Sequence, residues 1–201
     1  MVQMVKVLQK KSKLVFGINR LGFTLLELII TIAIIGLLSV IIVPNIQRTT
    51  PRYEREAFVA RFNTLVQYGW QQSLSTHKIQ RITVDIGKKI ITLATSTDEK
   101  DKSGEFIFKP IADAVEDTEI GIPDQVQIKQ FFIEGFDMMT KFARSKTASV
   151  WFYIVPEGIA QNVVINFLDI KDLRDDQPRQ LSLVLNPFTV QFKTYDTFQK
   201  P

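Results

Sequence analysis

The sequence predicts an α+β fold in which one long N-terminal helix packs on antiparallel β-strands. Three observations predict it. Residues 23–43 form an unbroken apolar run, residues 52–76 repeat apolar side chains with a helical period, and eight short segments after residue 77 alternate apolar and polar side chains. A helix followed by a series of strands is typical of α+β domains, and we expect two small sheets.

Composition limits the chemistry that the chain can carry. With 201 residues, 45% of them hydrophobic, the chain is large enough for one core. It contains no cysteine, which excludes a disulfide framework, a thiolate metal site and a cysteine nucleophile.

The positive charge of the chain is concentrated at its N-terminus. Residues 1–22 hold five of the 25 Lys and Arg residues and no acid, so the remainder holds 20 basic against 21 acidic residues. A region so close to neutral lacks the broad basic face that binds phosphates. We therefore expect nucleic acid not to be a partner.

The apolar run from Phe23 to Val43 has 21 residues and would be about 30 Å long as a helix. This length predicts one membrane-spanning helix in contact with lipid. The basic residues before it place residues 1–22 in the cytoplasm and the chain after Pro44 outside. A secretory signal peptide is the alternative, but no small-residue cleavage site follows the run.

Glu27 is the only charged residue in this run. A carboxylate at the centre of a bilayer costs roughly 2.5 to 3.5 kcal/mol, so a plain anchor has no use for it. Glu27 is therefore a candidate functional residue.

The stretch "RLGFTLLELIITIAIIGLLSVIIVP", Arg20 to Pro44, resembles the class III signal of type IV prepilins and type II secretion pseudopilins. The resemblance implies that a prepilin peptidase cuts after Gly22 and removes residues 1–22. Phe23 then becomes an N-methylated N-terminus, and Glu27 is the family's glutamate at the fifth position.

The new amino group at Phe23 would have a pKa of about 7.7 to 8.0 and would be largely cationic at neutral pH. We expect it to pair with Glu27 of the preceding subunit, so that Glu27 sets the register of assembly. A pair within one subunit and a Glu27 carboxylate that reaches water are the alternatives.

The helix is predicted to continue through residues 44–77 as an amphipathic extension. Pro44 and Pro51 lack an amide donor, so we expect a kink at each. The apolar face of the extension is predicted to lie on a sheet, with a partner groove or a membrane-surface helix as alternatives. This face holds Phe58, Val59, Phe62, Leu65, Val66, Gly69 and Trp70.

Residues 78–201 are predicted to form a β-rich globular domain. Two charged segments, "TSTDEKDKSGE" and "DIKDLRDDQPRQ", are predicted to be solvent loops. Strands are expected in "QRITVDI", "IITLATS", "EFIFKPI", "QVQIKQFFI", "SVWFYIV", "QNVVINFLDI", "RQLSLVL" and "FTVQFKTY".

Parts of this domain resemble the H-type minor pseudopilins and related minor type IV pilins. The segments concerned are "REAFVARFNTLVQYGWQQSLSTHKIQRITVDI" and the last strands from "WFYIVPEGIAQ" to "FTVQF". One departure is the last turn, "LNPFT", where the family has a threonine-glycine pair.

The resemblance implies a pilin-like structural subunit that helps initiate or cap the filament driving protein export across the outer membrane. Implied partners are the prepilin peptidase, other minor and major pseudopilins and the inner-membrane secretion platform. The implied location is the inner membrane, with the C-terminal domain in the periplasm. The alternative is a minor type IV pilin of pilus assembly or DNA uptake, but the last residues hold only Lys193 and Lys200 beside Asp196.

No residue pattern predicts an enzyme, a cofactor or a metal site. His77 is the only histidine, has no Ser/Asp partner pattern, and is expected to cap a helix or face solvent. Asp172, Asp175 and Asp176 are clustered like calcium ligands, but the segment lacks the glycine and spacing of a calcium loop. A solvated acidic loop is favoured over a calcium site.

Overall fold

The computed structural model describes residues 24–111, 114, 116–142 and 149–201, without the side chains of residues 40–50, 141 and 142. The chain divides into two compact units, Met1–Val43 and Pro44–Pro201. Helix α1, Leu25–Thr76, starts in the first unit and ends in the second. Its helical assignment is continuous through Pro44 and Pro51. The kinks predicted at these prolines stay predictions.

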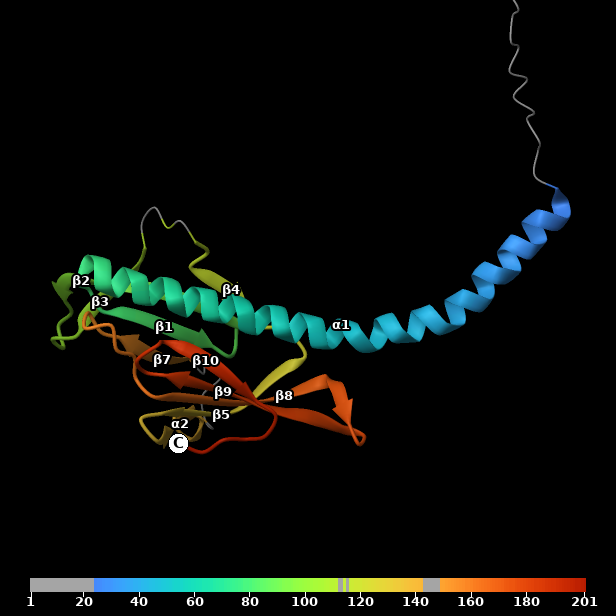
Figure 1. The fold of residues 1–201 in the computed structure, drawn as a ribbon. Helices are drawn as coiled ribbons and strands as arrows, with labels where there is room; N and C mark the ends of the chain where they lie inside the picture. The colour runs from blue at the N-terminus through green and yellow to red at the C-terminus, as the bar shows by residue number, and fades with distance from the viewer. Residues whose placement is uncertain (1–23, 112–113, 115, 143–148) are drawn as a thin grey trace, which may run out of the picture. The chain divides into compact units, whose positions relative to one another are not determined.

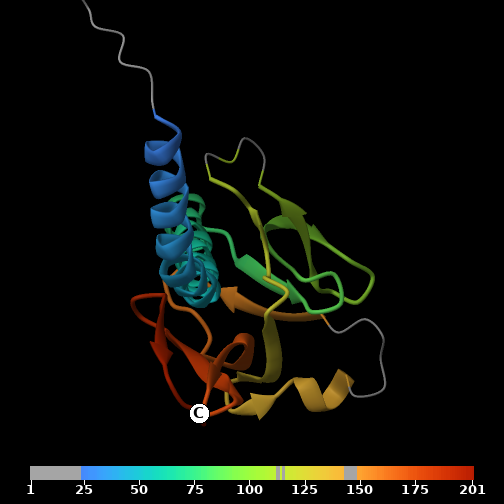
Figure 2. The same cartoon turned by 90° about the vertical axis from the view of Figure 1, so that its right-hand side faces the viewer.

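After α1 the chain forms two antiparallel sheets, which Figures 1 and 2 show from two directions. The first sheet has the order β3-β2-β1-β7, with β4 also paired to β2, and the second has the order β10-β9-β8-β5-β6. The predicted α+β class, a helix on two small antiparallel sheets, is confirmed. The elements are β1 (Gln80–Asp85), β2 (Ile90–Lys100), β3 (Phe106–Pro110), β4 (Glu119–Gly121), β5 (Val126–Ile133), β6 (Phe136–Asp137), α2 (Met139–Phe142), β7 (Ser149–Ile154), β8 (Val163–Arg174), β9 (Gln177–Asn186) and β10 (Gln191–Tyr195).

Both charged segments predicted to be solvent loops are largely strand, so that prediction was wrong. Strand β2 continues to Lys100, which is paired with Phe106 of β3. Strands β8 and β9 pair as far as Arg174 and Gln177, at the tip of their hairpin. Pairing of backbone groups across a hairpin does not need apolar side chains, and the charged side chains at the two tips, such as Lys100, Arg174 and Asp175, remain exposed to water.

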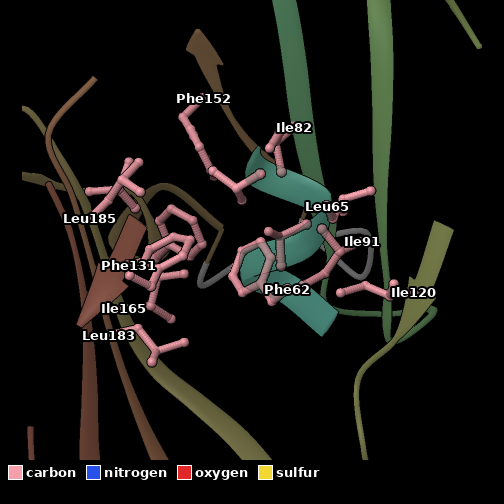
Figure 3. Packing of buried hydrophobic residues seen from close by; sticks show 14 of the residues in the cluster. Phe62, Leu65, Ile82, Ile91, Ile120, Phe131, Phe152, Ile165, Leu183 and Leu185 are labelled. Atoms are coloured by element: carbon pink, nitrogen blue, oxygen red, sulfur yellow. The ribbon is translucent and has the colours of Figure 1, made fainter. Parts of the chain in front are cut away.

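The core lies where α1 meets the inner faces of both sheets. In Figure 3, Phe62 and Leu65 of α1 lie between Ile82 and Ile91 of the first sheet and Ile165 of the second. The predicted apolar face of α1 is confirmed as the buried one. On this face Phe58, Phe62, Leu65, Val66 and Gly69 are buried, and Val59 and Trp70 are half-buried.

Gly69 lets α1 approach the first sheet closely. A Cβ atom at this position would lie 3.0 Å from Leu93 Cδ1 and 3.3 Å from Ile154 Cδ1, both on the first sheet. The next residue, the half-buried Trp70, donates its indole N–H to the carbonyl of Gly158 at 2.9 Å. The end of the helix is thus fixed by a close backbone approach and one directed hydrogen bond.

Side chains of α1 take the place of a neighbouring strand at the edge of the second sheet. Asn63 accepts the backbone N–H of Phe192 at 2.7 Å and donates to the carbonyl of the same residue at 3.2 Å. Gln67 donates to the carbonyls of Thr189 and Val190 at 2.8 and 2.7 Å. Strand β10 is therefore an edge strand, and the helix satisfies the backbone groups of Phe192 on that edge together with two carbonyls of the preceding turn.

The C-terminal residues are bound to the outer face of the second sheet. Asn166 and Ser182 are fully buried on that face and are hydrogen-bonded to each other. Both accept the backbone N–H of Gln199, at 3.2 and 3.0 Å, and Asn166 also donates to the Gln199 carbonyl at 2.9 Å. The tail thereby supplies further hydrogen-bond partners to two buried polar side chains of the sheet.

We predict that Asn63→Ala destabilises the compact unit Pro44–Pro201 by about 1 to 3 kcal/mol, because it leaves the partly buried Phe192 N–H and carbonyl unpaired. Denaturant unfolding measures this free energy. The neighbouring Thr64→Ala is the control, since the Thr64 hydroxyl is exposed and bonds only its own helix, at the Ala60 carbonyl. Equal losses in the two variants would contradict the role given to Asn63.

Candidate functional site

The first candidate site is the start of α1, where Glu27 lies in the first helical turn. The backbone N–H of Glu27 donates to Thr24 Oγ1 at 3.2 Å, so Thr24 caps the helix. Thr24 and Glu27 have the spacing of a capping box, and an acidic side chain is favourable at a helix N-terminus. Local structure thus gives Glu27 a stabilising position in the isolated chain.

The surface around Glu27 is almost entirely apolar and exposed. The hydroxyls of Thr31 and Ser39 bond the carbonyls of Glu27 and Ile35, four residues earlier, at 2.6 and 2.7 Å. The Glu27 carboxylate makes no hydrogen bond or ion pair with any described residue. A large apolar surface of this kind indicates a lipid or protein contact. The exposed fractions are between 47% and 76% for Leu25, Leu26, Leu28, Ile29, Ile30, Ile32, Ile34, Ile35, Leu37 and Leu38.

Gly22 and Phe23, the predicted cleavage and methylation site, lie outside the described residues. Within the part of the chain that is described, no helix is both long and apolar enough to cross a membrane.

The second candidate site is a buried ion-pair network between α1 and the β8–β9 hairpin. Arg55 Nη1 lies 2.8 Å from Asp169 Oδ2 and 2.6 Å from Asp172 Oδ2. The side chains of Arg55 and Asp169 are only 6% and 0% exposed. Arg179 extends the network, with 3.3 Å to Asp172 and 2.9 Å to Asp196.

The network fixes the position of α1 on the second sheet. A buried arginine is tolerated only when carboxylates compensate its charge, so Arg55 requires Asp169 and Asp172 at this place. Asp169 in turn accepts the backbone N–H groups of Lys171 and Asp172, both at 3.2 Å. These contacts are structural, because every charged group is used by a neighbour within the domain.

The acidic residues considered as calcium ligands have other roles. Asp172 belongs to the ion-pair network, and Asp175 and Asp176 form the turn between β8 and β9 with φ angles of 52° and 59°. Asp and Asn adopt this left-handed conformation more readily than most residues. No group of three or more His, Cys, Asp or Glu side chains among the described residues is arranged to hold a metal ion.

His77 follows the last residue of α1, is exposed, and has a φ of 54°. This is the left-handed conformation that commonly ends a helix. The expectation of a helix-end or surface position is confirmed.

Sequence analysis missed Arg55, although a signal was available. Arg55 lies three residues before Phe58 and seven before Phe62, and so belongs to the apolar stripe of the helix. A charged residue on such a stripe predicts a buried partner of opposite charge. Its partners, more than 110 residues away, were not predictable from spacing.

Comparison with known proteins supports the N-terminal signal. Residues 18–43 match the prokaryotic N-terminal methylation motif. The expected methylation signal is thereby confirmed, while cleavage and methylation themselves stay predictions.

Two solved structures of the minor pseudopilin EpsH, from the type II secretion system of Vibrio cholerae, are similar to this chain. One is 8% identical with a TM-score of 0.48, and the match covers 70% of this chain and 95% of the EpsH chain. The other is 11% identical with a TM-score of 0.47, and the match covers 73% and 98% of the two chains. These values are too low to transfer a function or a site from EpsH.

We predict that Arg55→Met destabilises the unit Pro44–Pro201 by about 3 to 5 kcal/mol, because it leaves Asp169 buried without its counter-charge. Denaturant unfolding measures the change. Arg52→Met is the matched control on the same helix, because the Arg52–Glu56 pair is exposed and its loss should not be measurable. Similar losses of unfolding free energy in the two variants would contradict the prediction that the buried ion pair contributes more to stability than the exposed one.

We also predict an acid-dependent loss of stability that involves Asp172. Burial disfavours ionised Asp172, but hydrogen bonds and charges of Arg55 and Arg179 outweigh burial and hold its pKa below the ordinary 3.8. A lowered pKa stabilises the folded state at pH values above the ordinary pKa, and this contribution disappears as the pH falls through the lowered value.

The free energy of unfolding should therefore decrease with falling pH below about pH 4, and less steeply in Asp172→Asn. Asp175→Asn, in the exposed turn, should keep the unaltered slope. Titration of unfolding against pH measures both, and a slope unchanged in Asp172→Asn would refute the assignment.

Proposed function

We propose that this chain is a minor pseudopilin, a structural subunit of a type II secretion pseudopilus that helps initiate or cap the filament. In this proposal residues 23–43 anchor it in the inner membrane before assembly, and the domain after Pro44 lies in the periplasm. Its partners are the prepilin peptidase, other pseudopilins and the inner-membrane secretion platform. The proposal assigns it no catalytic step.

The observation that carries the proposal is the exposed apolar helix with one carboxylate, Glu27, within the methylation motif of residues 18–43. The first part of this helix, from Leu25 to Leu38, leaves its large apolar side chains largely exposed, and such a surface requires lipid or neighbouring helices. The same apolar surface can contact lipid first, while the chain is in the membrane, and then the helices of neighbouring subunits in the filament core. Glu27 then supplies the one directional contact in an otherwise non-directional surface.

The test is mass spectrometry of the N-terminus of the chain purified from its own cells, combined with in-cell crosslinking from the domain. We expect a chain that begins at a methylated Phe23 and crosslinks to minor pseudopilins and platform proteins. Crosslinks to pilus shaft subunits and a retraction machinery would instead place it in a type IV pilus. An uncut N-terminus would overturn both assignments.

We further predict that Glu27→Ala is cut after Gly22 but is largely absent from assembled filaments, because the Phe23 ammonium of the next subunit loses its counter-charge. Fractionation of filaments with N-terminal sequencing measures both properties. Thr31→Val is the control, since it removes a hydroxyl bonded only to the Glu27 carbonyl and keeps the carboxylate. Normal assembly of Glu27→Ala would refute the register role.

A further inference from the structure

The outer face of the first sheet carries a cluster of aromatic side chains around one arginine. Side chains alternate along β1 and β7, so Ile82 and Phe152 are fully buried while Arg81, Trp151 and Tyr153 lie on the opposite face. The pairing of the strands places Arg81 opposite Tyr153. The cluster is therefore a property of the sheet and not of a loop.

The arginine and two of the rings are stacked. The guanidinium carbon of Arg81 lies 4.2 Å from the ring centroid of Phe108 on β3. The rings of Phe108 and Tyr153 are stacked with centroids 5.7 Å apart and an interplanar angle of 28°. Phe106 lies two residues before Phe108 on β3, and Trp151 lies two residues before Tyr153 on β7. We call these five residues the aromatic platform: Arg81, Phe106, Phe108, Trp151 and Tyr153.

The platform is exposed and hollowed. Trp151 is 46% exposed and Phe106 is 40% exposed. A cleft of about 200 Å³ is lined by Phe106, Phe108 and Tyr153, with Ile79, Val155 and Glu105 completing it. Aromatic residues and arginine are the residue types that dominate binding energy at protein interfaces, especially where they surround a pocket.

Arg81 lacks a carboxylate partner among the described residues, and its buried Nε atom makes no hydrogen bond. Of the other cations nearby, Lys78 pairs with Asp98 at 3.8 Å and Lys109 with Glu99 at 3.4 Å. The ammonium of Lys100 on β2 lies 5.0 Å from the centroid of the Phe106 ring. A guanidinium is planar, and stacking on a ring occupies its face while the N–H groups at its edge can still bind a bidentate carboxylate. The geometry therefore leaves a place for one acidic group.

The charges around the platform indicate which class of partner supplies that group. Charges of both signs lie around it, with Glu105 in the cleft, Lys100 over the Phe106 ring, and the Lys78–Asp98 pair next to Ile79, which lines the cleft. A polyanion such as nucleic acid requires a more uniformly basic surface. An apolar centre with a mixed polar rim is typical of a contact between proteins.

We propose that the aromatic platform docks an acidic segment of a partner protein. Arg81 binds a carboxylate of that segment, and an adjacent apolar side chain of the partner fills the cleft beside Phe106. The inference goes beyond the proposed function, because it concerns a surface of the domain and holds whichever filament the chain serves.

The test uses the full chain in its own cells, with the photocrosslinker p-benzoylphenylalanine placed at Trp151 or at Phe106. The control position is Phe188, which is 74% exposed in the β9–β10 turn and lies outside the platform. We expect crosslinks from the platform positions to a protein segment with Asp or Glu close to the crosslinked residue. Arg81→Glu should reduce their yield about tenfold or more, as loss of an interface hot spot does.

Two further variants separate binding from folding. Lys109→Glu reverses a charge on the same sheet outside the platform and should leave the crosslinks unchanged. If Arg81→Glu lowers the amount of folded chain, Arg81 is kept and the crosslinked acidic residue of the partner is changed to lysine. The crosslinking yield should then fall by the same factor. That lysine combined with Arg81→Glu should restore the yield.

Four results would overturn the proposal. They are platform crosslinks no stronger than those from Phe188, crosslinks to nucleic acid or glycan, crosslinks to protein segments without a nearby carboxylate, and a yield insensitive to charge reversal on both sides. The N-terminal mass and the identity of the filament play no part in these outcomes. Failure here is therefore distinguishable from failure of the proposed function.

Discussion

The seating of one helix stripe on two sheets is the contact on which the rest of the domain depends. Phe62 and Leu65 are almost fully buried between the two inner faces, and the sheets have no common strand in the described part of the chain. The helix therefore joins them, through apolar contacts in the middle and polar contacts at both ends. Arg55 holds it to the β8–β9 hairpin, while Trp70 holds it to the turn at Gly158. Burial supplies the driving force, and the polar contacts select one position of the helix along the sheets.

The elements governed by side-chain period were predictable from the sequence. The helix, its buried face and the eight main strands follow from apolar side chains at regular spacing, and each is present in the structure. The ends of β2, β8 and β9 were not predictable in this way, because their runs of charged residues show no alternation of apolar and polar side chains although their backbone groups are paired. The short strands β4 and β6 were missed for the same reason, since three and two residues are too few to show a period.

The functional features differ in how well each could be predicted from the sequence. Glu27 is conspicuous because it is the one charge in an apolar run, and a local motif explains it. The Arg55 network and the aromatic platform depend on residues brought together by strand pairing and helix docking. Arg81 and Phe108 are adjacent only because β1, β2 and β3 have a particular register. Sequence shows which residues are unusual, and the tertiary structure shows which of them meet.

The edge of β10 has a consequence for the order in which the chain becomes a folded protein. Asn63 and Phe192 are separated by 129 positions, so the helix leaves the ribosome long before the strand that it covers. At the usual speed of translation this interval is on the order of ten seconds. Throughout it the apolar stripe of the helix has no sheet to lie on, and contacts of such long range also close slowly. The nascent chain therefore passes through a stage in which the apolar run before Pro44 and the apolar stripe around Phe62 are both exposed. Binding to a chaperone or to the membrane surface would cover these apolar surfaces during that stage.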